Sequence, residues 1–134
     1  MKLLFLTLIL TLAFGGFAAT ANAQEKQQIS VRVGKQKRAS RSKLTVKFVS
    51  LVEDSRCPDD ANCIQAGNAR IKVTVSKPGS EPITFEANTS LGAKGNVYEG
   101  YAIYLTSLTP TPNANIRINR NAYTATFSIS RLSR

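Results

Sequence analysis

The 134-residue sequence contains no histidine and no tryptophan, and it has only two cysteines. Without histidine, neither a Ser-His-Asp triad nor a Cys-His pair can form, and the usual nitrogen ligand of zinc is missing. Acidic residues are scarce as well, with 8 Asp and Glu against 18 Lys and Arg. The resulting net charge of +10 favours contact with anionic surfaces, and it also keeps a small protein in solution.

The only long apolar run lies at the N-terminus. Lys2 precedes an apolar stretch over residues 3–17, and Ala21-Asn22-Ala23 has the small-x-small pattern that signal peptidases cleave. The run is short for a membrane span, and the layout is typical of a secretory signal peptide over residues 1–23. We predict cleavage after Ala23 and a secreted or periplasmic mature chain of residues 24–134, with a retained N-terminal anchor as the alternative.

Cys57 and Cys63 are separated by five residues. Two cysteines in an exported chain are expected to form a disulfide bond. Their spacing does not match the C-x-x-C pattern of redox or zinc sites. We therefore predict a Cys57–Cys63 disulfide that shapes a turn and stabilises the fold by about 2 kcal/mol.

Apolar and polar residues alternate through residues 24–134, and no stretch repeats apolar residues with a helical period. Ile71, Val73 and Val75 show the pattern most clearly. The same alternation predicts strands over 29–33, 44–52, 83–87, 101–108 and 123–129, with a short edge strand within 115–121. Short strands separated by Gly, Pro and Asn turns predict one all-β domain, an antiparallel β-sandwich or small barrel of about six to seven strands.

Two details refine this prediction. The alternation changes phase between Phe48 and Leu51, which indicates a β-bulge. Residues 34–43 and 88–96 are polar and contain glycine, so both are predicted to be exposed connections.

The stretch 53–67 contains half of the acidic residues, namely Glu53, Asp54, Asp59 and Asp60. Carboxylates crowded on one turn differ from the pair that faces across a glycosidase cleft, so we expect no catalytic residues and no cofactor. Asp59, Asp60 and Asn62 are candidate calcium ligands by their oxygen atoms, but their spacing matches no EF-hand loop. We favour a structural role, in which Asp54 and Asp59 accept backbone N–H bonds or pair with Arg56.

The connection over residues 34–43 is rich in basic residues interleaved with Ser and Gln. Its candidate anion-binding residues are Lys35, Lys37, Arg38, Arg41 and Lys43. Such a run suits an anionic partner, which we expect to be a polysaccharide, a membrane surface or an acidic protein. We do not expect nucleic acid, because no aromatic residue is interleaved for base stacking. The alternative is a solvated loop without a partner.

The region around the cysteines resembles a motif of small exported bacterial proteins that are uncharacterised. The matching residues are Val52-Glu53-Asp54-Ser55-Arg56-Cys57-Pro58, Cys63 and Ala66-Gly67. Leu105, Leu108, Pro110 and Pro112, and then Tyr123, Ala125 and Phe127, resemble the C-terminal half of that group. The group often has Trp where this chain has Gln65. The resemblance implies export, a disulfide and a β domain, and it implies no activity.

These observations predict a secreted or periplasmic binding or accessory protein that is not an enzyme and recognises an anionic partner through a basic face. The alternative is a secreted proteinase inhibitor that presents either the disulfide-closed turn or the loop over residues 88–100. A calcium-dependent adhesion-type module is the third hypothesis.

Overall fold

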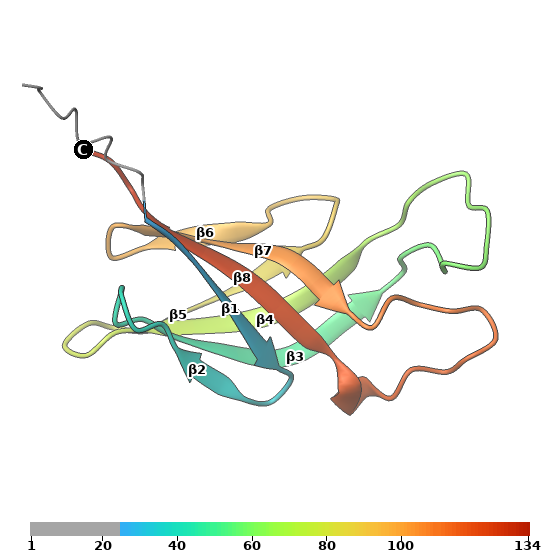
Figure 1. Ribbon diagram of the computed structural model, residues 1–134, viewed down its shortest axis with the longest axis horizontal. Helices are drawn as coiled ribbons and strands as arrows, with labels where there is room; N and C mark the ends of the chain where they lie inside the picture. The colour runs from blue at the N-terminus through green and yellow to red at the C-terminus, as the bar shows by residue number, and fades with distance from the viewer. Residues whose placement is uncertain (1–24) are drawn as a thin grey trace, which may run out of the picture.

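A computed structural model describes residues 25–134, which form two antiparallel sheets of four strands each (Figure 1). One sheet has the order β1-β8-β7-β6 and the other the order β2-β3-β4-β5. The elements are β1 (Lys26–Arg32), β2 (Gln36–Arg38), β3 (Thr45–Asp54), β4 (Ala69–Ser76), β5 (Ile83–Asn88), β6 (Gly95–Tyr98), β7 (Tyr101–Thr109), the 3-10 helix η1 (Arg120–Ala122) and β8 (Thr124–Arg131).

The all-β prediction is confirmed, and because the sheets do not close on each other the architecture is a β-sandwich rather than a barrel. The predicted signal peptide lies outside the described residues. Within residues 25–134, no helix is long and apolar enough to span a bilayer.

The core between the sheets is built by the alternation seen in the sequence. In β4, Ile71, Val73 and Val75 are fully buried, whereas Lys72 between them is exposed. Burying one such side chain contributes about 1.5–3 kcal/mol, so the apolar face of each strand must turn inward. The largest fully buried side chains come from both sheets: Phe48, Phe127, Leu44, Ile71, Ile103 and Ile129.

The bulge predicted in β3 is also confirmed. The pairing of β3 with β4 shifts register between Phe48 and Ser50, and it shifts again between Leu51 and Glu53. These irregularities bring β3 to its end at Asp54, where the cysteine-containing loop begins.

The prediction of one exposed connection over residues 34–43 is wrong. The short strand β2 pairs with β3, and Ala39 and Ser42 in the following turn are buried. The three side chains of β2 are all exposed, so no alternation marks the strand in the sequence. Only its hydrogen bonding to β3 makes it a strand.

Two other segments differ from the prediction as well. The loop expected over 88–96 ends early, because β6 starts at Gly95 and pairs with β7. The segment 115–121 is not an edge strand: Ile116 forms only an isolated bridge with Asn113, and the segment then runs into η1. The carbonyl oxygen of Asn119 accepts the Ala122 N–H, so the chain closes a turn where an extended strand was expected.

Candidate functional site

Residues 55–68, here called the disulfide loop, join β3 to β4 and project from one end of the sandwich, shown in green in Figure 1. The predicted bond between Cys57 and Cys63 is present. Below it, the Ser55 N–H donates to the Asn68 carbonyl at 2.7 Å and the Cys57 N–H donates to the Ala66 carbonyl at 2.9 Å. The two arms of the loop are therefore held together both by the disulfide and by bonds that continue the β3–β4 pairing.

Gly67 allows these arms to approach. Its φ is +70°, and a Cβ atom at this position would lie 1.8 Å from the Ser55 carbonyl oxygen. Only glycine combines this left-handed conformation with such close backbone contact. The glycine of the Ala-Gly part of the motif is thus explained by geometry.

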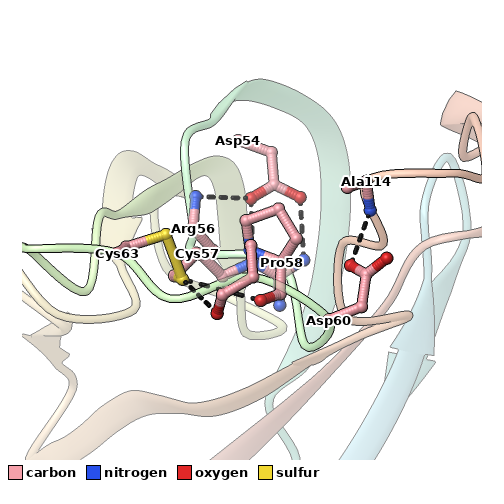
Figure 2. The surroundings of a disulfide bond; sticks show 8 residues. Asp54, Arg56, Cys57, Pro58, Asp60, Cys63 and Ala114 are labelled. Atoms are coloured by element: carbon pink, nitrogen blue, oxygen red, sulfur yellow. Dashed lines mark hydrogen bonds and ion pairs between the residues drawn. A yellow bond between two sulfur atoms is a disulfide. The ribbon is translucent and has the colours of Figure 1, made fainter.

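An ion pair between Asp54 and Arg56 lies at the base of the loop, beside the disulfide (Figure 2). The Arg56 Nε and Nη2 atoms donate to the two carboxylate oxygens of Asp54, each at 2.8 Å. The exposed fractions of the two side chains are only 14% for Arg56 and 8% for Asp54. The hydroxyl of Tyr123 also donates to Asp54, at 2.9 Å. The predicted pairing of Asp54 with Arg56 is present.

The same guanidinium holds a distant part of the chain. Arg56 Nη1 donates to the Leu108 carbonyl at 2.6 Å, and Nη2 donates to the Pro110 carbonyl at 2.8 Å. Arg56 therefore connects the disulfide loop to the end of β7 and to the loop of residues 110–119. We call this arrangement the Arg56 clamp.

Burial and hydrogen bonding act in opposite directions on the Asp54 carboxyl. Burial by itself raises its pKa, but hydrogen bonds from Arg56 and Tyr123, together with the positive charge of Arg56, hold the pKa below its ordinary value. The hydrogen bond to Asp54 is the main reason that the pKa of Arg56 is raised. Burial, followed by the bond to Asp54, raises the pKa of Tyr123. At neutral pH Asp54 and Arg56 form a charged pair and Tyr123 is neutral. This arrangement serves to stabilise the fold.

The structure does not arrange the candidate calcium ligands as a metal site. Both carboxylate oxygens of Asp60 accept hydrogen bonds from the loop 110–119, one from the Ala114 N–H at 2.8 Å (Figure 2) and one from the Asn115 Nδ2 at 2.9 Å. Asp59 and Asn62 are exposed. Within residues 25–134, no group of three or more His, Cys, Asp or Glu side chains is placed to hold a metal ion. In this geometry Asp60 has a structural role, since it ties two loops together.

Asn68 is a site residue that the sequence did not reveal. Its side chain is buried, and its Oδ1 accepts the N–H groups of Ser90 at 3.1 Å and Leu91 at 3.2 Å. Its Nδ2 donates to Asn88 Oδ1 at 2.8 Å. Asn68 thereby fixes the loop after β5 against the base of the disulfide loop. An asparagine next to a glycine is typical of a turn, so the sequence around Asn68 does not predict that its side chain holds the loop after β5.

The upper part of the disulfide loop extends into solvent. Ile64 has a relative exposure of 104%, the highest of the large apolar side chains in residues 25–134. Its neighbours Cys63, Gln65 and Ala66 are exposed too. The loop thus combines a firmly held base with an uncharged tip at which the Ile64 side chain is fully exposed to solvent.

The predicted anion-binding residues lie on a different part of the molecule, along β2 and its turns. All five are exposed and lie along the edge strand β2 and its turns. Arg38 faces the same side of the sheet as Lys47, whereas Lys37 pairs with the buried Val46 and starts from the other side of the strand. The outward-facing Lys47 and Lys72 adjoin β2, because Gln36 pairs with Lys47 and Lys47 pairs with Thr74, two residues along β4 from Lys72. We call the whole set the basic surface; it consists of Lys35, Lys37, Arg38, Arg41, Lys43, Lys47 and Lys72.

Within residues 25–134, Arg41 is the one member of the basic surface that lies within ion-pair distance of an acidic side chain. Its partner is Glu25, at 3.6 Å, and both side chains are largely exposed. Such a pair is worth less than about 1 kcal/mol. The other members form no ion pair within residues 25–134, although Lys72 lies directly opposite Glu86 in the pairing of β4 with β5.

A groove of about 930 Å³ lies beside Arg41, at the end of the sandwich where the C-terminus leaves. Its lining includes Arg131 and Arg134 but also Glu25 and Glu99. Because the charges of its walls are mixed, this groove is less suited to an anion than the basic surface is.

No protein-family model matches this sequence, and neither a curated protein nor a solved structure matches it. The geometry defines a disulfide-containing β-sandwich with a braced loop at one end and a basic edge on one sheet. The disulfide points to an oxidising compartment.

Proposed function

We propose that this protein is an exported binding protein, not an enzyme, that recognises an acidic polysaccharide through its basic surface. The single observation behind this proposal is the accumulation of seven exposed cationic side chains along β2 and the adjoining face, of which only Arg41 forms an ion pair within residues 25–134. A polymer with regularly spaced carboxylate or sulfate groups would contact several of these side chains at once. Export is proposed because of the signal-like N-terminus and the disulfide.

The surroundings of the basic surface favour a sugar polymer over a lipid surface. The neighbouring outward-facing side chains are hydroxyl or amide groups, such as Gln36, Thr45 and Thr74, which can bond to sugar hydroxyls. None of the exposed large apolar side chains in residues 25–134 belongs to β2, to β3 or to the turns on either side of β2. A membrane-binding face would normally add apolar side chains that enter the acyl region.

The experiment measures the salt concentration at which the protein elutes from immobilised heparin. Lys37→Ala/Arg38→Ala/Lys47→Ala removes three charges of the basic surface, two of them on the outward face of the sheet. It should elute at a clearly lower salt concentration than the wild-type protein, because these exposed contacts are screened over about 8–10 Å at physiological ionic strength.

A matched control removes three charges elsewhere, with Lys94→Ala/Arg117→Ala/Arg120→Ala. It has the same net charge as the test variant but should elute close to the wild-type position. Equal shifts for both variants would mean that net charge alone governs retention, and the proposal would be wrong. Binding to anionic vesicles that exceeds binding to heparin would assign the surface to lipid instead.

A further inference from the structure

The disulfide loop is held more firmly than a connection between two neighbouring strands requires. One tie is the Cys57–Cys63 bond, and a second is the Arg56 clamp. The third is formed by Asp60, which binds the backbone and a side chain of residues 114–115. The ties act at Arg56, at Asp60 and at the Cys57–Cys63 bond, so they restrict the segment 61–66 from its N-terminal side and at Cys63, while Ile64 remains in water.

The tip itself is uncharged, and Ile64 is its one large apolar side chain. Residues 61–66 read Ala-Asn-Cys-Ile-Gln-Ala, and each of them is exposed. Burying the Ile64 side chain against a partner would contribute about 1.5–3 kcal/mol. Little of that gain would be lost to ordering the loop, because the ties already restrict it.

The shape and charge of the loop define the partner it fits. A projecting loop is complementary to a concave surface and not to a flat one. Within residues 57–66, Asp59 and Asp60 are the only charged residues, which disfavours approach to anionic lipid headgroups. A protein cleft with an apolar pocket is the surface that fits.

We propose that residues 61–66 insert into the active-site cleft of a secreted endoproteinase, with Ile64 in an apolar subsite, and that the protein is a reversible competitive inhibitor. Endoproteinases bind several consecutive residues of an exposed chain in a groove. The backbone bonds from Cys57 to Ala66 and from Ser55 to Asn68 span Ile64, so they hold the two sides of the loop together even after cleavage beside it. This inference is independent of the basic surface, which lies on another part of the sandwich.

The test uses three endoproteinases that accept aliphatic side chains in a main subsite: pancreatic elastase, subtilisin and papain. Inhibition constants are measured for the wild-type protein, for Ile64→Asp and for the control Leu132→Asp, which alters an exposed aliphatic residue near the C-terminus. We expect competitive inhibition of at least one enzyme. Ile64→Asp should raise its inhibition constant more than about tenfold, corresponding to about 1.4 kcal/mol, and Leu132→Asp should leave it within about twofold.

A second variant tests whether the tie formed by Asp60 is needed for inhibition. Asp60→Ala keeps Ile64 but removes the two side-chain bonds of Asp60 to the loop 110–119 and leaves the bond from the Asp59 N–H to the Pro112 carbonyl. It should therefore inhibit less well and be cleaved faster within the loop. This variant leaves the core and the Arg56 clamp intact, so loss of inhibition would not reflect unfolding. Circular dichroism of both variants checks that point.

Four results would overturn the inference: no inhibition of any of the three enzymes, inhibition unchanged in Ile64→Asp, steady hydrolysis of the loop without inhibition, or binding to anionic vesicles that depends on Ile64. Heparin elution of Ile64→Asp should equal that of the wild-type protein. Failure of the loop inference is therefore distinguishable from failure of the proposed polysaccharide binding.

Discussion

Replacing Arg56 by alanine should destabilise the fold far more than its position on a loop suggests. The change removes two hydrogen bonds to the Asp54 carboxylate and two to the Leu108 and Pro110 carbonyls, with donor–acceptor distances between 2.6 and 2.8 Å. The Asp54 side chain, only 8% exposed, would lose its counter-ion. Breaking a buried pair by removing one partner costs about 3–5 kcal/mol.

Urea denaturation followed by circular dichroism measures this free energy of unfolding. For a domain of this size, a loss of about 3 kcal/mol should also lower Tm by about 12 °C or more. Arg70→Ala is the matched control, because Arg70 pairs with Glu53 at 3.6 Å and with Glu86 at 3.4 Å on the surface. That variant should lose less than about 1 kcal/mol.

The double variant Asp54→Ala/Arg56→Ala separates the buried charge from the lost contacts. It should be less destabilised than the sum of the two single variants, because neither partner is then left as an uncompensated buried charge. If Arg56→Ala costs no more than Arg70→Ala, the clamp contributes nothing to stability and the reasoning is refuted.

Three further changes test the same region. Gly67→Ala should cost about 2 kcal/mol or more in urea unfolding, because its Cβ would meet the Ser55 carbonyl at 1.8 Å; a neutral result would contradict the geometry. Cys57→Ser/Cys63→Ser should lose about 2 kcal/mol, and equal melting temperatures would disprove it. Since the pKa of Asp54 is lower in the folded than in the unfolded protein, its contribution to stability is complete above about pH 5 and is lost as pH falls through the folded pKa. Acid titration of Asp54→Asn should therefore show a flatter loss of stability below that pH.

Most of the fold could be predicted from the sequence because strand periodicity is a local property. Ile71, Val73 and Val75 mark β4 by their spacing alone, and the phase change after Phe48 marks the bulge. The strands β2 and β6 were not predicted for the opposite reason. They are short, and apolar and polar residues do not alternate in them. They are strands only because β3 and β7 offer them unpaired backbone groups.

The candidate site, like the fold, could be predicted only in part. The disulfide follows from the presence of just two cysteines, and the pairing of Asp54 with Arg56 follows from their closeness in the chain. The bonds from Arg56 to Leu108 and Pro110 span 52 and 54 residues. Backbone carbonyls are present at every position, so nothing in the sequence marks these two as the acceptors.

The sequence by itself determined an all-β chain with one small disulfide and an excess of positive charge, because alternation, cysteine count and composition are read without knowing any long-range contact. Only the tertiary structure decided that the basic residues follow a sheet edge, that Asn68 and Arg56 hold neighbouring loops, and that Ile64 points into solvent. Exposure and hydrogen bonding across the chain depend on which segments meet, and that is settled when the two sheets pack.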